Sequence, residues 1–137
     1  MITIETTYDG ELRTRSKHMR SGTIIQTDAP PDNEGKGEFF SPTDLLSASL
    51  GTCMITVMGI AAKKHNIDLS SARIEVEKIM QASPRKVAEI RVKIFLNRTY
   101  PEKEKNILET AGKTCPVALR LHPDLKQVID FIYADNE

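Results

Sequence analysis

The sequence has no excess of charge of either sign. Lysine and arginine together number 19, aspartate and glutamate also number 19, and the formal net charge is zero. No long basic or acidic run interrupts this balance. Because nucleic acids and anionic lipids attract proteins through concentrated positive charge, we expect neither a nucleic-acid partner nor a membrane partner.

The beginning of the chain lacks the apolar core of a signal peptide. Its first 17 residues, MITIETTYDGELRTRSK, alternate in polarity and carry charge early, so we expect a cytoplasmic protein. The longest uncharged stretch, residues 45–62, approaches the length of a membrane span. It nevertheless contains hydroxyl side chains and glycines, namely Ser47, Ser49, Gly51, Thr52, Thr56 and Gly59. A buried central helix explains this stretch better than a membrane span.

Cysteine is scarce: the chain has only Cys53 and Cys115, which are separated by 62 positions. A reducing cytosol disfavours structural disulfides, so a pair of thiols there is usually catalytic or redox-sensing. Neither a CxxC motif nor a metal-type spacing is present, and we expect no metal and no cofactor. Sequence spacing alone does not bring the two thiols together.

The length of 137 residues suits one domain, residues 1–137, without internal repeats. Hydrophobic periodicity and turn signals predict the following elements. They are strands at 2–6, 12–16 and 22–27, a helix at 42–65, strands at 72–81 and 87–98, helices at 101–112 and 116–121, and a strand at 128–133. This order predicts an α+β domain with helices laid against antiparallel sheet.

Two segments before and at the start of the long helix have distinct signals. Residues 28–40, DAPPDNEGKGEFF, are rich in proline, glycine and charge, which favours a mobile loop that could cover a site. The next residues, Ser41-Pro42-Thr43-Asp44, predict a helix start resembling a capping box.

The surroundings of the two cysteines differ. Leu46, Leu50, Cys53, Val57 and Ile60 recur at four- and three-residue steps, so Cys53 is predicted to face the core. A core cysteine most often only fills space, and burial alone would make the thiol inert.

Cys115 precedes Pro116, which disfavours helical geometry at the residue before it and predicts Cys115 as the N-cap of the next helix. Unpaired amides there favour a thiolate. Cys115 is thus equally compatible with a reactive and a structural role.

Two motifs resemble the OsmC/Ohr family, named for osmotically inducible protein C and organic hydroperoxide resistance proteins. SPTDLLSASLGTCMITVM is similar to the family's Pro-x-acid-Leu helix with a cysteine about nine residues later, and TCPVALRLHPDL is similar to its second Cys-Pro motif. The resemblance implies an OsmC-like fold, with antiparallel sheets around a long central helix. It also implies an intertwined homodimer with its active sites at the subunit interface.

The resemblance further implies a two-cysteine peroxidase that serves the response to oxidative stress. Cys53 would be the peroxidatic thiol, which attacks an organic hydroperoxide and becomes a sulfenic acid. Cys115 would be the resolving thiol, and a dithiol or protein reductant would reduce the resulting disulfide. Apolar residues around Cys53 would favour a fatty or aryl hydroperoxide over hydrogen peroxide.

The sequence departs from the family in the groups that activate the thiolate. Better-studied members resemble one another in using an arginine held by a glutamate, and the organic-hydroperoxide branch places this glutamate where Thr43 stands. Asp44 is therefore a weak support residue, and as a first-turn acid it also complements the helix dipole. Arg20 is a weak prediction for thiolate activation, with Arg15 and Lys36 as further options.

Two other functions remain open at this stage. The first is a non-enzymatic OsmC-like protein that binds an apolar ligand or senses redox state, which the missing glutamate favours. The second is a cysteine hydrolase or thiol transferase, which requires a histidine beside a thiol. The candidates for that base are His18, His65 and His122.

Overall fold

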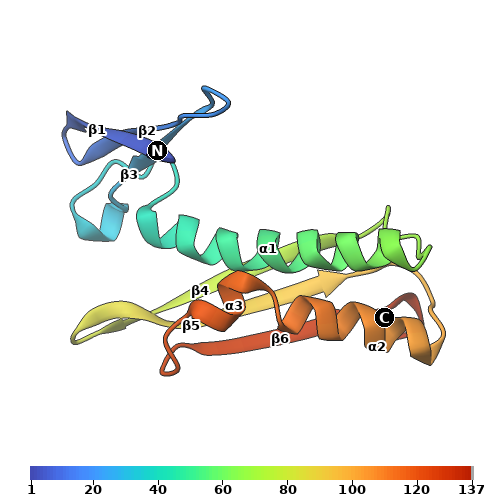
Figure 1. The fold of residues 1–137 in the computed structure, drawn as a ribbon. Helices are drawn as coiled ribbons and strands as arrows, with labels where there is room; N and C mark the ends of the chain where they lie inside the picture. Colours follow the sequence, from blue (N-terminus) through green and yellow to red (C-terminus); the bar gives the residue numbers. More distant parts are fainter. Residues whose placement is uncertain (137) are drawn as a thin grey trace. The chain divides into compact units, whose positions relative to one another are not determined.

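A computed structural model describes residues 1–136, so Glu137, the last residue of the predicted domain, lies outside the described residues. The chain divides into a first unit, Met1–Leu46, and a second unit that begins at Ser47. Figure 1 shows both units in colours that follow the sequence from blue at the N-terminus to red at the C-terminus.

The first unit is a three-stranded antiparallel sheet in the order β1-β2-β3. Its strands are β1 (Ile4–Gly10), β2 (Arg13–His18) and β3 (Ile24–Asp28), followed by the short 3-10 helix η1 (Pro31–Asn33). The predicted turn after Asp9 is confirmed, because Gly10 and the two residues after it all have positive φ. A glycine is well suited to that left-handed backbone, since it has no side chain to clash.

Few residues of the first unit are buried. Within residues 1–46, burial is confined to Thr27, Asp28 and Ser41, which are all polar. Large apolar side chains are exposed along the same unit, including Ile4, Tyr8, Ile24, Ile25 and Phe40. This unit therefore has no apolar core within its own chain.

The second unit contains a mixed sheet and most of the helical structure. The long helix α1 (Pro42–Lys64) begins in the first unit and continues into the second. The remaining elements are β4 (Arg73–Ala82), β5 (Arg85–Phe95), α2 (Glu102–Lys113), α3 (Pro116–Arg120), β6 (Lys126–Ile132) and η2 (Ala134–Asn136). The α+β class predicted from the sequence is confirmed.

The last strand differs from the predicted antiparallel pairing. The sheet order is β4-β5-β6, and β6 pairs with β5 in the parallel direction. The cause is the connection: α2 and α3 lie between these strands, and a helical crossover returns the chain in the direction of the strand that it left.

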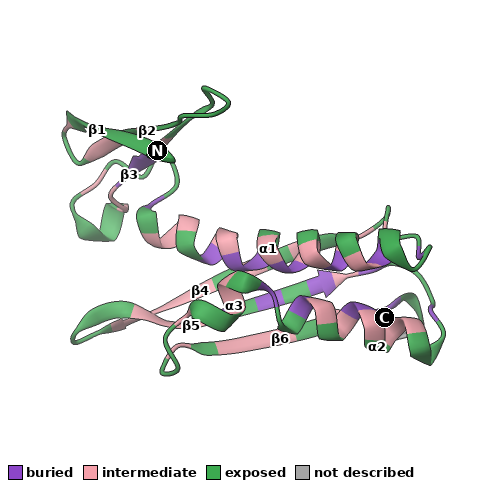
Figure 2. Cartoon of the chain, in the orientation of Figure 1, coloured by how far each residue is buried: buried purple, intermediate pink, exposed green. Residues whose placement is uncertain are grey.

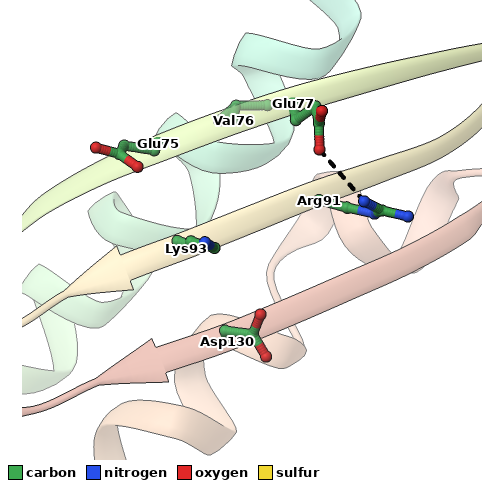
Figure 3. A pocket seen from close by; sticks show the side chains of 6 residues that line it. All are labelled: Glu75, Val76, Glu77, Arg91, Lys93 and Asp130. Atoms are coloured by element: carbon green, nitrogen blue, oxygen red, sulfur yellow. Dashed lines mark hydrogen bonds and ion pairs between the residues drawn. The ribbon is translucent and has the colours of Figure 1, made fainter. Parts of the chain in front are cut away.

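The helices of the second unit cover one face of its sheet, and Figure 3 shows their ribbons behind the strands. The buried core between them includes Leu50, Met54 and Met58 of α1, the alternate β5 residues Ile90, Val92 and Ile94, and Leu108 of α2. Figure 2 shows this buried layer along the side of α1 that faces the sheet. The apolar side chains on β5 recur at every second residue, as expected for a strand with one covered face.

The predicted core stripe on α1 is confirmed for Leu50, Cys53 and Val57, which are buried or pack against the core, and is wrong at its two ends. The buried residues are Ser47, Leu50, Gly51, Met54, Met58 and Ala62. Of the predicted stripe, Leu46 is 38% exposed and Ile60 is 63% exposed. The cause is that apolar residues occur on several sides of this helix, so the sheet contact decides which side becomes buried. Cys53 consequently lies half-buried at the margin of the buried stripe.

Gly51 fixes this contact between α1 and the sheet. A Cβ atom built at Gly51 would lie 2.8 Å from Ile74 Cδ1 and 2.8 Å from Val76 Cγ2, both on β4. Real Cβ atoms do not approach other carbons so closely, because the overlap is repulsive. A larger residue at position 51 would therefore require the side chains of Ile74 and Val76, or the helix itself, to shift.

By length and composition α1 could span a membrane, a test that the core helix of a soluble protein also passes. One third (33%) of its most apolar window is buried inside the chain. The remaining face is uncharged between Asp44 and Lys63. This uncharged exposed face is a surface that another polypeptide could cover.

We predict that Gly51→Ala destabilises the fold by about 1–3 kcal/mol, the usual result of adding a methyl group to a full core. Gly59→Ala is the matched control on the same helix, because a Cβ atom there meets nothing within 4 Å. It should stabilise the helix by up to about 1 kcal/mol through the better helix propensity of alanine. Urea unfolding of both variants measures the difference, and equal effects would contradict the close contact at Gly51.

Candidate functional site

The helix that holds Cys53 begins with a reciprocal capping interaction. The backbone N–H of Ser41 donates to Asp44 Oδ2 at 3.0 Å, and the backbone N–H of Asp44 donates to Ser41 Oγ at 3.0 Å. Two N–H groups that a helix start leaves unpaired are thereby satisfied. The predicted helix start is confirmed, while the support role predicted for Asp44 stays a prediction.

The two thiols, 62 positions apart in sequence, lie together in the second unit. Cys53 is half-buried near the middle of α1, and Cys115 is fully buried at the start of α3. The Cys53 thiol is near enough to raise the pKa of Cys115, and neither cysteine is in a disulfide. Both pack against the apolar core of the second unit. The tertiary fold thus supplies the proximity that the sequence spacing does not.

Cys115 is the N-cap of α3, as predicted from the proline that follows it. Its Sγ accepts a hydrogen bond from the backbone N–H of Ala118 at 3.4 Å, and Pro116 occupies the first turn. Burial raises the pKa of the Cys115 thiol, the Ala118 amide opposes this effect, and the neighbouring Cys53 thiol raises the pKa further. The net pKa lies above its ordinary value because the amides of Ala118 and Val117 do not replace the water that burial removes. Cys115 is therefore a protonated thiol at neutral pH, which differs from the predicted thiolate.

A pair of neighbouring free thiols is suited to reversible disulfide chemistry. A disulfide requires sulfur atoms about 2.05 Å apart and a narrow range of Cβ separations, so distant cysteines cannot form one without backbone movement. Thiols that already lie side by side in the folded chain meet this requirement more readily than distant ones. Oxidation of one of them would place an electrophilic sulfur beside a nucleophile that can displace its oxygen.

A fixed guanidinium lies in the first unit at a position that the sequence analysis did not select. Arg13 Nε donates to Asp28 Oδ1 at 2.7 Å, and Arg13 Nη2 donates to Asp28 Oδ2 at 2.8 Å. The same Nη2 donates to Glu38 at 3.1 Å, and the guanidinium lies 4.7 Å from the centroid of the Phe39 ring. Arg13 and Asp28 are register partners on β2 and β3. Because strand register is a tertiary property, no local pattern in the sequence indicates this pair.

The charges of this cluster stabilise one another. The Arg13 guanidinium holds the pKa of the Asp28 carboxyl below its usual value, although burial of the carboxyl acts in the opposite direction. Asp28 in turn raises the pKa of Arg13. The side chain of Asp28 is 1% exposed, so the bidentate pairing satisfies a carboxylate that water does not reach. Arg13 is therefore an oriented, permanently charged group.

The predicted cationic residues have other surroundings. Arg20 is exposed in the turn after β2, Arg15 lies 3.7 Å from Asp9, and Lys36 lies 2.8 Å from Glu11. The structure leaves their predicted role in thiolate activation untested.

The segment 28–40, predicted as a mobile cover, contains η1 and is fastened to the neighbouring strands. The Lys36–Glu11 ion pair is one link, and the Arg13–Glu38 ion pair is another. The backbone N–H of Ala29 also donates to the Leu12 carbonyl at 3.1 Å. Its predicted covering role stays a prediction.

The three histidines contact groups other than the thiols. His18 Nδ1 is 2.7 Å from Ser21 Oγ, and His122 Nδ1 is 2.8 Å from Asp124 Oδ1. His65 is exposed just after the end of α1. A cysteine hydrolase needs a histidine on its nucleophile, so these contacts give no support to that alternative.

A hollow of about 360 Å³ lies on the opposite face of the second sheet from the helices (Figure 3). Five of its six lining side chains are charged: they are Glu75, Glu77, Arg91, Lys93 and Asp130, with Val76 as the sixth. Glu77 and Arg91 form an ion pair at 3.4 Å across neighbouring strands. Alternating charges of this kind are the ordinary solvated face of a sheet, and we place the candidate site at the thiols instead.

The pH dependence of stability tests the protonation of Cys115. Folding raises the pKa of the Cys115 thiol, so the unfolded chain loses the thiol proton at a lower pH than the folded chain does. The free energy of unfolding therefore falls as pH rises from about 8.5 upward. We predict that Cys115→Ala flattens this decline between about pH 8.5 and 10, below the range where tyrosines titrate. Urea unfolding at several pH values measures both slopes. Equal slopes would show that the fold does not raise the pKa of Cys115.

Comparisons with known proteins relate this geometry to a family. The family model described as OsmC-like protein matches residues 35–127. The structure of a candidate osmotic stress induced and detoxification response protein from Psychrobacter arcticus has 46% sequence identity and a TM-score of 0.91, with 96% of each chain covered. No curated protein matches the sequence.

More distant solved structures share the fold. An organic hydroperoxide resistance protein OsmC from Legionella pneumophila has 15% identity and a TM-score of 0.72, covering 96% of this chain and 98% of its own. An organic hydroperoxide resistance protein from Elizabethkingia anophelis has 16% identity and a TM-score of 0.65, covering 97% of both chains. With the family model spanning more than half of the sequence, the chain belongs to the OsmC-like family.

Proposed function

We propose that this chain is a two-cysteine peroxidase that reduces organic hydroperoxides. The observation that carries the proposal is that two free thiols, Cys53 and Cys115, lie in the same core cluster, with Cys53 near enough to raise the pKa of Cys115. The Cys53 thiolate attacks the terminal oxygen of the O–O bond, which gives a Cys53 sulfenic acid and an alcohol. Cys115 then attacks the Cys53 sulfur, and a disulfide forms with release of water. A small dithiol or a protein dithiol restores both thiols and is itself oxidised to a disulfide.

The surroundings of the thiols support this division of roles. Cys53 is half-buried, whereas Cys115 is fully buried and accepts a hydrogen bond from the Ala118 amide. A peroxide reaches the half-buried thiol more readily. The raised pKa of Cys115 keeps this thiol protonated, so its S–H can donate to a Cys53 thiolate before the attack.

The apolar setting supports an organic substrate. Cys53 packs against the apolar core, and the exposed α1 side chains near it in sequence include Leu46 and Ile60. Apolar surface favours a fatty or aryl hydroperoxide over the small, polar hydrogen peroxide. The names of the solved relatives from Legionella pneumophila and Elizabethkingia anophelis support the same substrate class.

A thiolate in an apolar setting also requires a compensating cation. Arg20, with Asp44 in support, remains our proposal for this role. Arg13 is the alternative, because Asp28 holds its guanidinium in one orientation.

We also propose a homodimer, which the unpartnered surfaces of the chain support. Apolar side chains of the first unit are exposed, and the outer face of α1 is uncharged for most of its length. Such surfaces are typical of subunit interfaces. The cytoplasm, which keeps thiols reduced between turnovers, is the proposed location.

The proposed chemistry predicts a defined thiol count. One equivalent of cumene hydroperoxide should consume both thiols of the reduced protein and lower its mass by about two units, through loss of two hydrogens. Cys115→Ser should accumulate a sulfenic acid that dimedone traps, and Cys53→Ser should not react. Intact-mass spectrometry and thiol titration measure these outcomes. Hydrogen peroxide should react more slowly than cumene hydroperoxide.

Unchanged thiols in the wild-type protein would contradict the peroxidase. That result would favour the non-enzymatic reading, in which an apolar ligand binds equally well to wild type and Cys53→Ser. Arg20→Met and Arg13→Met, compared in the same assay, identify the activator as the variant that slows sulfenic acid formation.

The homodimer predicts that a charge on the outer face of α1 weakens self-association. Ile60→Glu should raise the dimer dissociation constant at least about tenfold, because it buries an unpaired carboxylate in the interface. Leu119→Glu is the control, since Leu119 is similarly exposed but lies on α3. Sedimentation equilibrium measures both. A wild-type chain that stays monomeric at high concentration would refute the dimer.

A further inference from the structure

One residue of α3 connects the Cys115 thiol to the sheet. The backbone N–H of Ala118 donates to Cys115 Sγ at 3.4 Å, and the backbone carbonyl of Ala118 accepts from Gln127 Nε2 at 3.0 Å. Gln127 lies on β6, nine positions further along the chain. The Gln127 side chain, Ala118 and the Cys115 sulfur thus form a continuous hydrogen-bonded path.

The position of Gln127 is set by the sheet. It pairs in register with Ile90 of β5, which is completely buried among the core residues beneath the helices. Gln127 itself is half-buried, so the amide reaches α3 from the covered side of the sheet. A strand held by a ladder of hydrogen bonds is a rigid support for such a side chain.

The helix α3 needs support of this kind. It has only five residues, Pro116–Arg120, and helices so short are not stable on their own. The loop after α3 has a second link, from Lys86 Nζ to Asp124 Oδ2 at 2.6 Å, but both side chains are exposed. Exposed ion pairs contribute little, whereas a partly buried hydrogen bond fixes geometry more strongly.

We propose that Gln127 is a positioning residue that holds α3, through the Ala118 carbonyl, so that Cys115 stays beside Cys53. Its hydrogen bond thereby sets how readily the Cys53–Cys115 disulfide forms. The effect on disulfide equilibrium is independent of any peroxide, while the effect on resolution of a Cys53 sulfenic acid rests on the proposed function.

The stability of the Cys53–Cys115 disulfide shows whether Gln127 positions Cys115 or only stabilises the fold as a whole. Dithiothreitol supplies the exchange: the reduced protein and oxidised dithiothreitol give the protein disulfide and reduced dithiothreitol, with two electrons and two protons transferred. The equilibrium constant measures the effective concentration of Cys115 at Cys53. Loss of one hydrogen bond that restrains α3 should lower this constant about three- to tenfold.

Gln127→Met is the test variant, because methionine keeps a similar length and removes the amide donor. Gln81→Met is the matched control, since Gln81 is also half-buried but lies on β4. Lys86→Met removes the exposed link to Asp124. Alkylation and intact-mass spectrometry after equilibration give the disulfide fraction. We expect a three- to tenfold lower constant for Gln127→Met alone, about the effect of one hydrogen bond.

A second arm examines the proposed reaction. In a single turnover with cumene hydroperoxide, Gln127→Met should prolong the lifetime of the Cys53 sulfenic acid by the same factor and leave its rate of formation unchanged. If wild type is not oxidised by the peroxide, the proposed function fails, while the dithiothreitol equilibrium still decides the role of Gln127.

Several outcomes would overturn the positioning role. One is an equilibrium constant for Gln127→Met equal to that of wild type, and another is an equal decrease in Gln81→Met, which would reflect general loosening. Circular dichroism melting confirms that each variant is folded. Should Gln127→Met fail to fold, Gln127→Glu replaces it, because an ionised carboxylate keeps the shape but cannot donate, and the same decrease is expected.

Discussion

The contact of α1 with β4 at Gly51 determines most of the second unit. Without a side chain at this position, the helix backbone approaches Ile74 and Val76 directly. This approach fixes the rotation of α1, so that Leu50, Met54 and Met58 enter the core and Cys53 lies at its margin. A second close approach occurs where α2 meets α1, since a Cβ at Gly112 would lie 3.0 Å from Met58 Sδ. The chain then continues from α2 to Cys115 and places the second thiol against the first.

The chemistry of the thiol pair depends on the balance between burial and hydrogen bonding. Burial disfavours a charged Cys115 more than the Ala118 amide favours it, so this thiol retains its proton. In the proposed reaction, a protonated Cys115 would donate a hydrogen bond to the Cys53 thiolate and later supply the second sulfur of the disulfide. The same short helix that raises the pKa of Cys115 by burying it also fixes the direction of its sulfur.

Ion pairs hold the first unit together, whereas apolar packing holds the second. Arg13 joins β2, β3 and the segment after β3 through Asp28 and Glu38, and Phe39 lies against the guanidinium. Its apolar side chains remain exposed, in contrast to the dense core of the second unit. A unit of this kind gains apolar burial only from surfaces outside its own sheet, and this is the feature on which the proposed homodimer rests.

The sequence determined the features that depend on neighbouring residues. The long helix and its start at Ser41, the hairpin turn after Asp9 and the N-cap position of Cys115 all follow from local rules for proline, glycine, acids and hydroxyls. The two cysteine motifs also identified the family. Only the tertiary structure decided the rotation of α1, the parallel direction of β6, the Arg13–Asp28 pair and the meeting of the thiols. These features depend on contacts between segments far apart in the chain, which sequence periodicity does not encode.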